Sequence, residues 1–406
     1  MTLTRAAGAV IFFAFAFTYF FSALLRAVTA TLAPVFSAEL ALGAADLGLL
    51  AGAYFLGFAS MQLPLGKALD RFGPRRTLLV LLAVAVFGCA AFALASGLLG
   101  LIVARVLIGA GVAACLMAPL TLYRRIFSPA AQLRANSWML MTGSLGMVAS
   151  TLPVQWVLPV LGWRGLFWLV AALLAACMVL ILRLVPADEA TGAGERPADG
   201  GYSAIVRHPL FVALAPLGFF VYGGLIAVQS LWAGPWLTRV AHWSPEQAAQ
   251  GLFAINLSML LAFLCWGVVM PRLANKGIQP SRIMVWGVPL PLGLMLLNVT
   301  LGAGAGAAHW ALWCVACTFV SVSQPAVGAA FPSEQAGRAL SAFNLVIFSG
   351  VFCVQWGIGL LVDLLQVWGL AEAEAFRVSL GALGACGALA YAWFLRSRPL
   401  GAHNHA

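Results

Sequence analysis

The sequence predicts an all-α membrane protein in which twelve transmembrane helices form two pseudo-symmetric halves of six. The 406 residues are 63% hydrophobic and only 8% charged, which is too few charges to cover the surface of a water-soluble domain. The mean hydropathy of +0.99 agrees with this. Apolar stretches long enough to cross a bilayer recur along the whole chain, and one polar segment divides them into two sets.

Each apolar stretch is expected to form a helix, because lipid offers no partners for backbone N–H and C=O groups and a helix satisfies its own. A transmembrane barrel would instead need short segments of alternating polarity. About 20 helical residues cross a hydrocarbon core of about 30 Å. The expected helices span residues 9–34, 46–68, 76–96, 98–122, 136–158, 163–185, 209–235, 245–270, 282–302, 307–330, 336–364 and 376–396.

The polar segment 186–208 is rich in proline, glycine and charge, which is typical of a cytoplasmic linker. It separates an N-terminal half, residues 1–185, from a C-terminal half, residues 209–406. Repeated halves are common among membrane transporters.

Two helix starts are marked by local capping signals. Ser244 and Gln247 have the spacing of a capping box, and the intervening Pro245 suits a first helical position, so the eighth helix is expected to begin there. Ser333 and Glu334 predict the start of the eleventh helix in the same way.

The net charge of +10 is unevenly distributed. With the N-terminus placed inside, 17 of the 22 Lys and Arg residues lie in the cytoplasmic loops and tails. This positive-inside bias predicts a multi-pass protein of the bacterial inner membrane with both termini in the cytoplasm, and it explains the basic excess without nucleic-acid binding. The first apolar run is too long for a cleavable signal peptide. All eight cysteines lie in apolar segments, so neither a metal site nor a cofactor is expected.

The stretch "GKALDRFGPRR" concentrates charge between the second and third expected helices. It resembles the G-x-x-x-D-R-x-G-R-[RK] loop of the major facilitator superfamily, with Pro74 inserted before the basic pair. The run "RVLIGAGVAA", which starts at Arg105 and includes Gly109, resembles the R-x-x-x-G signature of the fourth helix of that family. The resemblance implies a monomeric transporter without enzymatic activity. It also implies conformational roles for Gly66, Asp70, Arg71, Gly73, Arg75, Arg76, Arg105 and Gly109.

In the superfamily that the loop resembles, the aspartate of the loop faces the cytoplasmic end of the eleventh helix. The resemblance therefore implies that Asp70 meets the helix start at Ser333 and Glu334 and holds the halves together on the cytoplasmic side, with Arg71 and Arg75 orienting it. A carboxylate at a helix N-terminus is stabilised by roughly 0.3–1 kcal/mol. The alternative is that the loop only sets membrane topology.

Arg26 and Arg105 are the two charges expected well inside membrane helices, both about 10–12 Å below the outer surface. A guanidinium in the membrane needs water, an anion or a carbonyl partner, so each is a functional candidate. For Arg105 the resemblance favours a conformational role over contact with substrate. Arg26 is similar to the substrate-anion ligand of organic-anion and organophosphate porters of the superfamily. The seventh helix has no second base, which favours a carboxylate over a phosphate ester; snorkelling is the alternative role for Arg26.

Uncharged polar residues in the C-terminal half are further candidates for a substrate site, because a few polar groups in an apolar cavity suit a small ligand. For any one amide, an interhelical hydrogen bond is the simpler interpretation. The candidates are Tyr222, Gln229, Trp232, Asn256, Gln324 and Asn344.

The leading hypothesis is a secondary carrier of a small organic anion, in which the two halves rock around a central site. Two alternatives stay open: an exporter of amphipathic compounds, and a ligand sensor that keeps the carrier fold. A sensor would be expected to have a longer tail than the ten residues that follow Arg396. Since no acid is expected deep in the membrane, three modes of transport are favoured: exchange for a counter-anion, facilitated movement, or entry of a proton on the carboxylate of the substrate.

Overall fold

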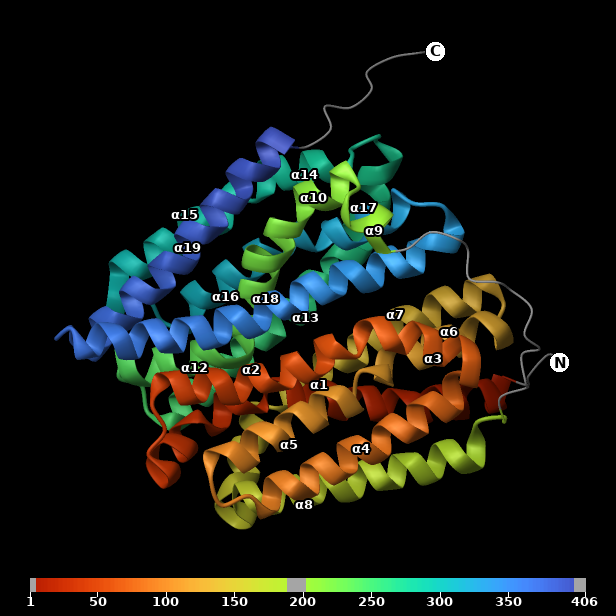
Figure 1. Cartoon of the computed structure of the whole chain (residues 1–406), viewed down its shortest axis with the longest axis horizontal. Coiled ribbons are helices and arrows are strands. Elements are labelled where there is room, and N and C mark those ends of the chain that lie inside the picture. Colours follow the sequence, from red (N-terminus) through yellow and green to blue (C-terminus); the bar gives the residue numbers. More distant parts are fainter. Residues whose placement is uncertain (1–4, 188–201, 398–406) are drawn as a thin grey trace.

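A computed structural model describes residues 5–187 and 202–397, and every regular element within these ranges is helical. The elements of the N-terminal half pack together on one side of the molecule and those of the C-terminal half on the other, as Figure 1 shows. The expected all-α membrane fold is confirmed. The division at 186–208 stays a prediction, because most of that segment lies outside the described residues.

The elements of the N-terminal half follow the expected order, with breaks inside several crossings. The second crossing bends by 43° between α2 and α3. The fourth breaks between α5 and α6. The bounds are α1 Arg5–Leu40, α2 Ala44–Ser60, α3 Gln62–Phe72, α4 Pro74–Leu94, α5 Leu98–Gly111, α6 Ala114–Ile126, α7 Pro129–Ala149 and α8 Leu152–Leu184.

The fifth and sixth crossings join at Gly162, inside α8. This residue has φ 63° and ψ 173°, a backbone conformation that residues with a Cβ rarely adopt. The chain therefore turns at Gly162, and the fifth crossing consists of α7 and the first part of α8. Length and hydropathy alone give ten candidate spans and one bent pair among the described residues. Counting the turn at Gly162 restores the twelve expected crossings.

The C-terminal half contains more irregular helix. The seventh crossing alternates α-helical with π-helical turns and extends to Val240, five residues beyond the expected end. The bounds are α9 Tyr202–Val206, α10 Pro209–Pro216, η1 Leu217–Tyr222, α11 Gly223–Ala227, η2 Val228–Trp232, α12 Ala233–Pro235, η3 Trp236–Val240, α13 Pro245–Asn275, α14 Pro280–Gly287, α15 Pro289–Leu301, η4 Gly302–Gly304, α16 Ala307–Cys317, η5 Thr318–Val322, α17 Ser323–Ala329, α18 Ser333–Val367 and α19 Glu372–Ser397.

Both predicted helix starts are confirmed. The amide of Gln247 donates to the Ser244 hydroxyl at 3.2 Å, and the Ser244 amide donates to the Gln247 side chain at 3.0 Å. This reciprocal pair is the expected capping box at the start of α13. Helix α18 begins at Ser333, although the side chains of Ser333 and Glu334 lie outside the described part of the structure.

The two ends of the bundle differ in charge. We call the end that carries Lys67, Arg71 and Arg183 the basic end, and the end that carries Glu39 and Asp363 the opposite end. Between the halves, the most extensive contact is that of α2 with α18, which lie side by side in Figure 1; α1 also packs on η2 and α12, and α7 on α13.

Glycines bring the α2 and α18 backbones together toward the opposite end. A Cβ added at Gly48 would lie 2.4 Å from the Gln355 carbonyl oxygen, and one at Gly359 would lie 2.3 Å from the Ala44 carbonyl oxygen. Neither distance admits a side chain. The halves are therefore closed against each other along this stretch.

Within the N-terminal half, α2 and α5 approach as closely. A Cβ at Gly109 would lie 1.9 Å from the Tyr54 carbonyl oxygen, and one at Gly57 would lie 2.1 Å from that of Val106. The glycine in the R-x-x-x-G signature is thus required for packing.

We expect Gly109→Ala to lower the free energy of unfolding by about 1–3 kcal/mol, because the added methyl group forces two backbones apart. The thermal unfolding midpoint of detergent-purified protein measures this. The matched control is Gly267→Ala in α13, where an added Cβ meets nothing within 4 Å. Equal midpoints for the two variants would contradict a packing role for Gly109.

Candidate functional site

Arg26 lies on the face of α1 that meets the other half. About 21 Å of helix separates it from the end of α1 at Leu40, which is deeper than the expected span 9–34 implied. Arg26 is half-buried, yet its Nε atom is buried and has no hydrogen-bond partner. A donor without an acceptor at this depth is costly, so the site favours a ligand that supplies one.

Three phenol groups lie within electrostatic range of the Arg26 guanidinium. Tyr19 is seven residues earlier on α1 and therefore shares its face. Tyr54 comes from α2, and Tyr222 comes from η1 in the other half. The Tyr54 hydroxyl donates to the Ser22 carbonyl oxygen at 3.2 Å, which holds its ring against α1.

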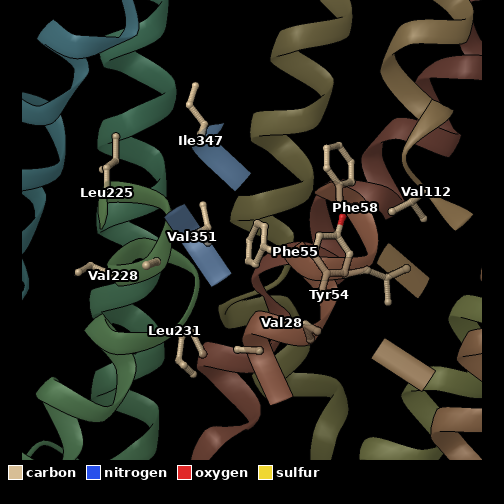
Figure 2. Close-up of a cluster of buried hydrophobic side chains, with 14 of the residues drawn as sticks. Val28, Tyr54, Phe55, Phe58, Val112, Leu225, Val228, Leu231, Ile347 and Val351 are labelled. Atoms are coloured by element: carbon tan, nitrogen blue, oxygen red, sulfur yellow. The ribbon is translucent and has the colours of Figure 1, made fainter. Parts of the chain in front are cut away.

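Two phenylalanine rings, one from each half, complete the surroundings of Arg26. Its guanidinium carbon is 5.5 Å from the ring centroid of Phe58 and 6.0 Å from that of Phe348. The two rings contact each other edge to face with centroids 4.6 Å apart, and Phe58 stacks on Tyr54 at 6.2 Å. Figure 2 shows Tyr54 and Phe58 among the side chains that both halves contribute here. The site combines one planar cation with an aromatic wall.

Arg105 is bound by the protein itself. It is fully buried, one terminal nitrogen donates to the Leu25 carbonyl oxygen at 2.8 Å, and the other donates to the Thr29 hydroxyl. Its guanidinium carbon also lies 5.4 Å from the Tyr54 ring centroid. Arg105 therefore fastens α5 to α1 through its terminal nitrogens, whereas its Nε, like that of Arg26, is buried without a partner.

The four predicted amides pair with one another. Gln229 donates to Asn256 at 2.9 Å, which joins η2 to α13, and Gln324 donates to Asn344 at 2.8 Å, which joins α17 to α18. The Trp232 indole is fully buried and donates to the Gln355 carbonyl oxygen at 3.2 Å. Of the predicted substrate residues, the structure thus brings Tyr222 to Arg26, while the others make interhelical hydrogen bonds.

The charged loop forms a tight turn between α3 and α4. Gly73 has φ 81°, which favours glycine, and Pro74 begins α4. Arg75 donates to the Leu182 carbonyl oxygen at 2.7 Å and so ties the turn to α8. The Asp70 side chain is exposed, but it is not without an interaction partner.

The other loop residues vary in their surroundings. The Arg71 guanidinium carbon lies 5.1 Å from the Phe72 ring centroid, Arg76 is exposed, and a Cβ at Gly66 would meet nothing within 4 Å. The predicted contact between Asp70 and Glu334 stays a prediction, because the Glu334 side chain is outside the described residues.

Sequence reasoning missed Tyr19, Tyr54, Phe58 and Phe348. The spacing of seven between Tyr19 and Arg26, and of four between Tyr54 and Phe58, are the signals that place each pair on one helix face. Nothing in the sequence indicates that Phe348 meets Phe58 across the halves.

Comparison with known proteins agrees with this architecture. The family model described as Major Facilitator Superfamily matches residues 15–352. A 3-(3-hydroxy-phenyl)propionate transporter of Escherichia coli (strain K12) is 26% identical over 325 residues, covering 76% of this chain and 77% of the relative.

Two solved structures share the fold. A D-xylose-proton symporter superposes with a TM-score of 0.76 at 15% identity, covering 96% of this chain and 98% of its own. A bacterial homologue of the human lysosomal transporter Spinster, in an inward-facing and unoccupied conformation, gives a TM-score of 0.71 at 18% identity, covering 98% of both chains.

The pairing of Gln229 with Asn256 predicts a measurable coupling in stability. Gln229→Leu and Asn256→Leu should each destabilise the protein, and the double variant should lose less than the sum, with a coupling energy of about 0.6–1.7 kcal/mol. Unfolding in mixed detergent micelles measures the cycle. The control cycle combines Gln229→Leu with Gln324→Leu, whose partner is Asn344, and should show no coupling. Equal coupling in both cycles would contradict the pairing.

Proposed function

This chain belongs to the major facilitator superfamily, and we propose that it is a secondary carrier of a small organic monoanion with an aromatic part. It moves this solute across the bacterial inner membrane by alternating access of the two halves to a central site at Arg26. The observation that carries the proposal is the position of Arg26, which is half-exposed between phenylalanines of the two halves and has a buried Nε without an acceptor. Of the residues that the structure describes, no carboxylate forms an ion pair with Arg26.

A carboxylate fits this position better than any other ligand group. Its two oxygens match the planar donor fork of a guanidinium, and the bond gains strength because both partners are charged. Tyr19 and Tyr222 place further hydroxyl groups within electrostatic range of Arg26. A cationic ligand would meet a positive site and would be excluded.

The ligand carries a single negative charge because Arg26 is the one cation proposed to contact it. Arg105 also has a buried Nε without a partner, but it is fully buried and both of its terminal nitrogens are bound, to Leu25 and Thr29. A phosphate ester has more charge and more acceptor oxygens than a carboxylate, and some of these oxygens would find no donor in the site.

The apolar part of the ligand rests on the rings of Phe58 and Phe348. Aromatic rings favour offset or edge-to-face contact with other rings, and the two phenylalanines already adopt such an arrangement with each other. The E. coli relative is named for an acid that combines a phenyl ring with a carboxylate. This supports an aromatic carboxylate as the substrate class.

Alternating access follows from the division of the site between the halves. Arg26, Tyr54 and Phe58 belong to the N-terminal half, whereas Tyr222 and Phe348 belong to the C-terminal half. The ligand therefore contacts both halves, and separating them at either end exposes it. The positive-inside bias places the basic end in the cytoplasm. No residue is proposed for ion coupling, so the acid moves by facilitated movement, with a proton on its own carboxylate, or in exchange for a counter-anion.

Replacing Arg26 tests the proposal directly. Arg26→Gln should weaken binding of 3-(3-hydroxyphenyl)propionate about 10- to 100-fold, because it removes a charged hydrogen-bond donor, and Arg26→Lys should have a smaller effect. Isothermal titration on monodisperse protein measures the affinities. The matched control is Arg377→Gln, because Arg377 lies in α19 and binds Glu374 and the Val299 carbonyl oxygen.

The ligand panel includes the neutral amide of the same acid and 3-phenylpropylammonium. We expect neither to bind. If the ammonium compound binds and the acid does not, the site belongs to an exporter of amphipathic compounds and the anion proposal is wrong.

Asp70 is proposed to hold the halves together at the basic end. Asp70→Asn should then lengthen the distance between spin labels on Ser128 and Gln279, which lie at that end in different halves. Double electron–electron resonance measures the distance distribution. The control is Lys67→Gln, an exposed charge on the same helix. An unchanged distribution for Asp70→Asn would leave the loop with a topological role only.

A further inference from the structure

Asp363 of α18 occupies the N-terminus of α2 in the other half. The Ala44 amide donates to one carboxylate oxygen of Asp363 at 3.1 Å, and the Ala45 amide donates to the other at 2.9 Å. The first amides of a helix have no partner within the helix and attract negative charge. Asp363 therefore caps a helix that is more than 300 residues away in the chain.

Helix α2 has little capping of its own. Its N-cap residue is Gly43, which has no side chain to accept a bond from the first turn. Asp46, within the first turn, accepts instead from the Gly43 amide at 3.2 Å. The amides of Ala44 and Ala45 are thus left to Asp363.

The backbone is shaped to admit this carboxylate. A Cβ at Gly43 would lie 3.2 Å from a carboxylate oxygen of Asp363, closer than nearly all real contacts. One turn before Asp363, Gly359 brings α18 against the Ala44 carbonyl oxygen. The two glycines, one on each helix, let the acid reach the amides.

We propose that Asp363 is a gating residue that holds the halves closed at the opposite end of the bundle during transport. Its bonds to α2 exist only while the two halves touch there. When the halves part, the Asp363 carboxylate and the Ala44 and Ala45 amides lose these hydrogen bonds and are solvated by water instead. The inference rests on the proposed alternating-access function, but it does not depend on the nature of the ligand.

Another hydrogen bond links the two halves at this end of the bundle. Arg239 at the end of the seventh crossing donates to the Ser37 hydroxyl of α1 at 2.6 Å and to Glu372 at 2.9 Å. The bond to Ser37 is a single hydrogen bond from the charged Arg239 guanidinium to a neutral hydroxyl group. Asp363 instead satisfies two backbone amides at once, and so it is expected to contribute more to closure.

The test measures the distance between the halves in substrate-free protein. Labels are attached to cysteines that replace the exposed residues Ser96 and Ala371, one in each half at the opposite end, after the incompletely buried Cys265, Cys353 and Cys386 are changed to serine. Loss of a helix cap changes a conformational equilibrium about fivefold. Asp363→Ala should therefore raise the ratio of open to closed molecules at this end by about fivefold.

The matched control is Asp46→Ala. It removes an acid from the same helix terminus, but the bond it breaks lies within one half and does not depend on contact between the halves. We expect Asp46→Ala to lower the thermal unfolding midpoint without changing the ratio of open to closed molecules. Asp363→Asn keeps one acceptor oxygen, so its ratio should lie between those of the parent protein and Asp363→Ala.

The proposal is overturned if Asp363→Ala leaves the distance distribution unchanged, or if Asp46→Ala shifts it equally. Because no ligand is added, either result is independent of whether Arg26 binds an anion. If Asp363→Ala fails to give folded protein, Asp363→Asn decides by the same measurement.

Discussion

The close approach of α2 and α18 is the constraint on which the rest of the structure depends. Gly48 and Gly359 let the two backbones meet, with no room for a Cβ at either position. Since α2 carries Tyr54 and Phe58 and α18 carries Phe348, this contact also assembles the aromatic wall beside Arg26. The ligand site and the closure of one end are therefore consequences of the same helix pair. A movement that separates these helices alters both together.

Two arginines inside the bundle show how local partners decide the role of a buried charge. Both arginines have a buried Nε without a partner. Arg105 is fully buried, and its two terminal nitrogens bind a carbonyl oxygen and a hydroxyl group of α1. Arg26 lies among phenols and phenylalanines and remains half-exposed. The first arrangement favours rigidity, whereas the second favours a ligand. Residue type and depth alone do not distinguish them.

The sequence predicted the fold well because hydropathy and charge bias act over whole helices. It also located the helix starts at Ser244 and Ser333. The first is fixed by a local capping box between Ser244 and Gln247. The expected spans also placed the turn between the fifth and sixth helices at 159–162, where Gly162 turns the chain. The first helix was predicted too short, at 9–34 instead of 5–40.

Predicting the site was harder because its members meet only in three dimensions. Each amide could be recognised as polar, but its partner lies on another helix, as Gln229 and Asn256 do. Phe58 and Phe348 look like ordinary lipid-facing or core residues until the α2 and α18 helices are placed side by side. Arg26 was found because a charge in an apolar helix is conspicuous on its own.

The second crossing and α18 run antiparallel, so the C-terminal end of each lies beside the N-terminal end of the other. Each carries an acid near its C-terminal end: Asp70 in α3 and Asp363 in α18. Asp363 caps α2 across the halves, and Asp70 is proposed to meet the start of α18 in the same way. If both act as caps, opening either end breaks one cap while closing the other end forms one. Because a cap contributes about 1 kcal/mol, the two states then differ little in free energy. A ligand that binds one state only a few kcal/mol more tightly is sufficient to shift such a balance, which is the condition a carrier needs to cycle.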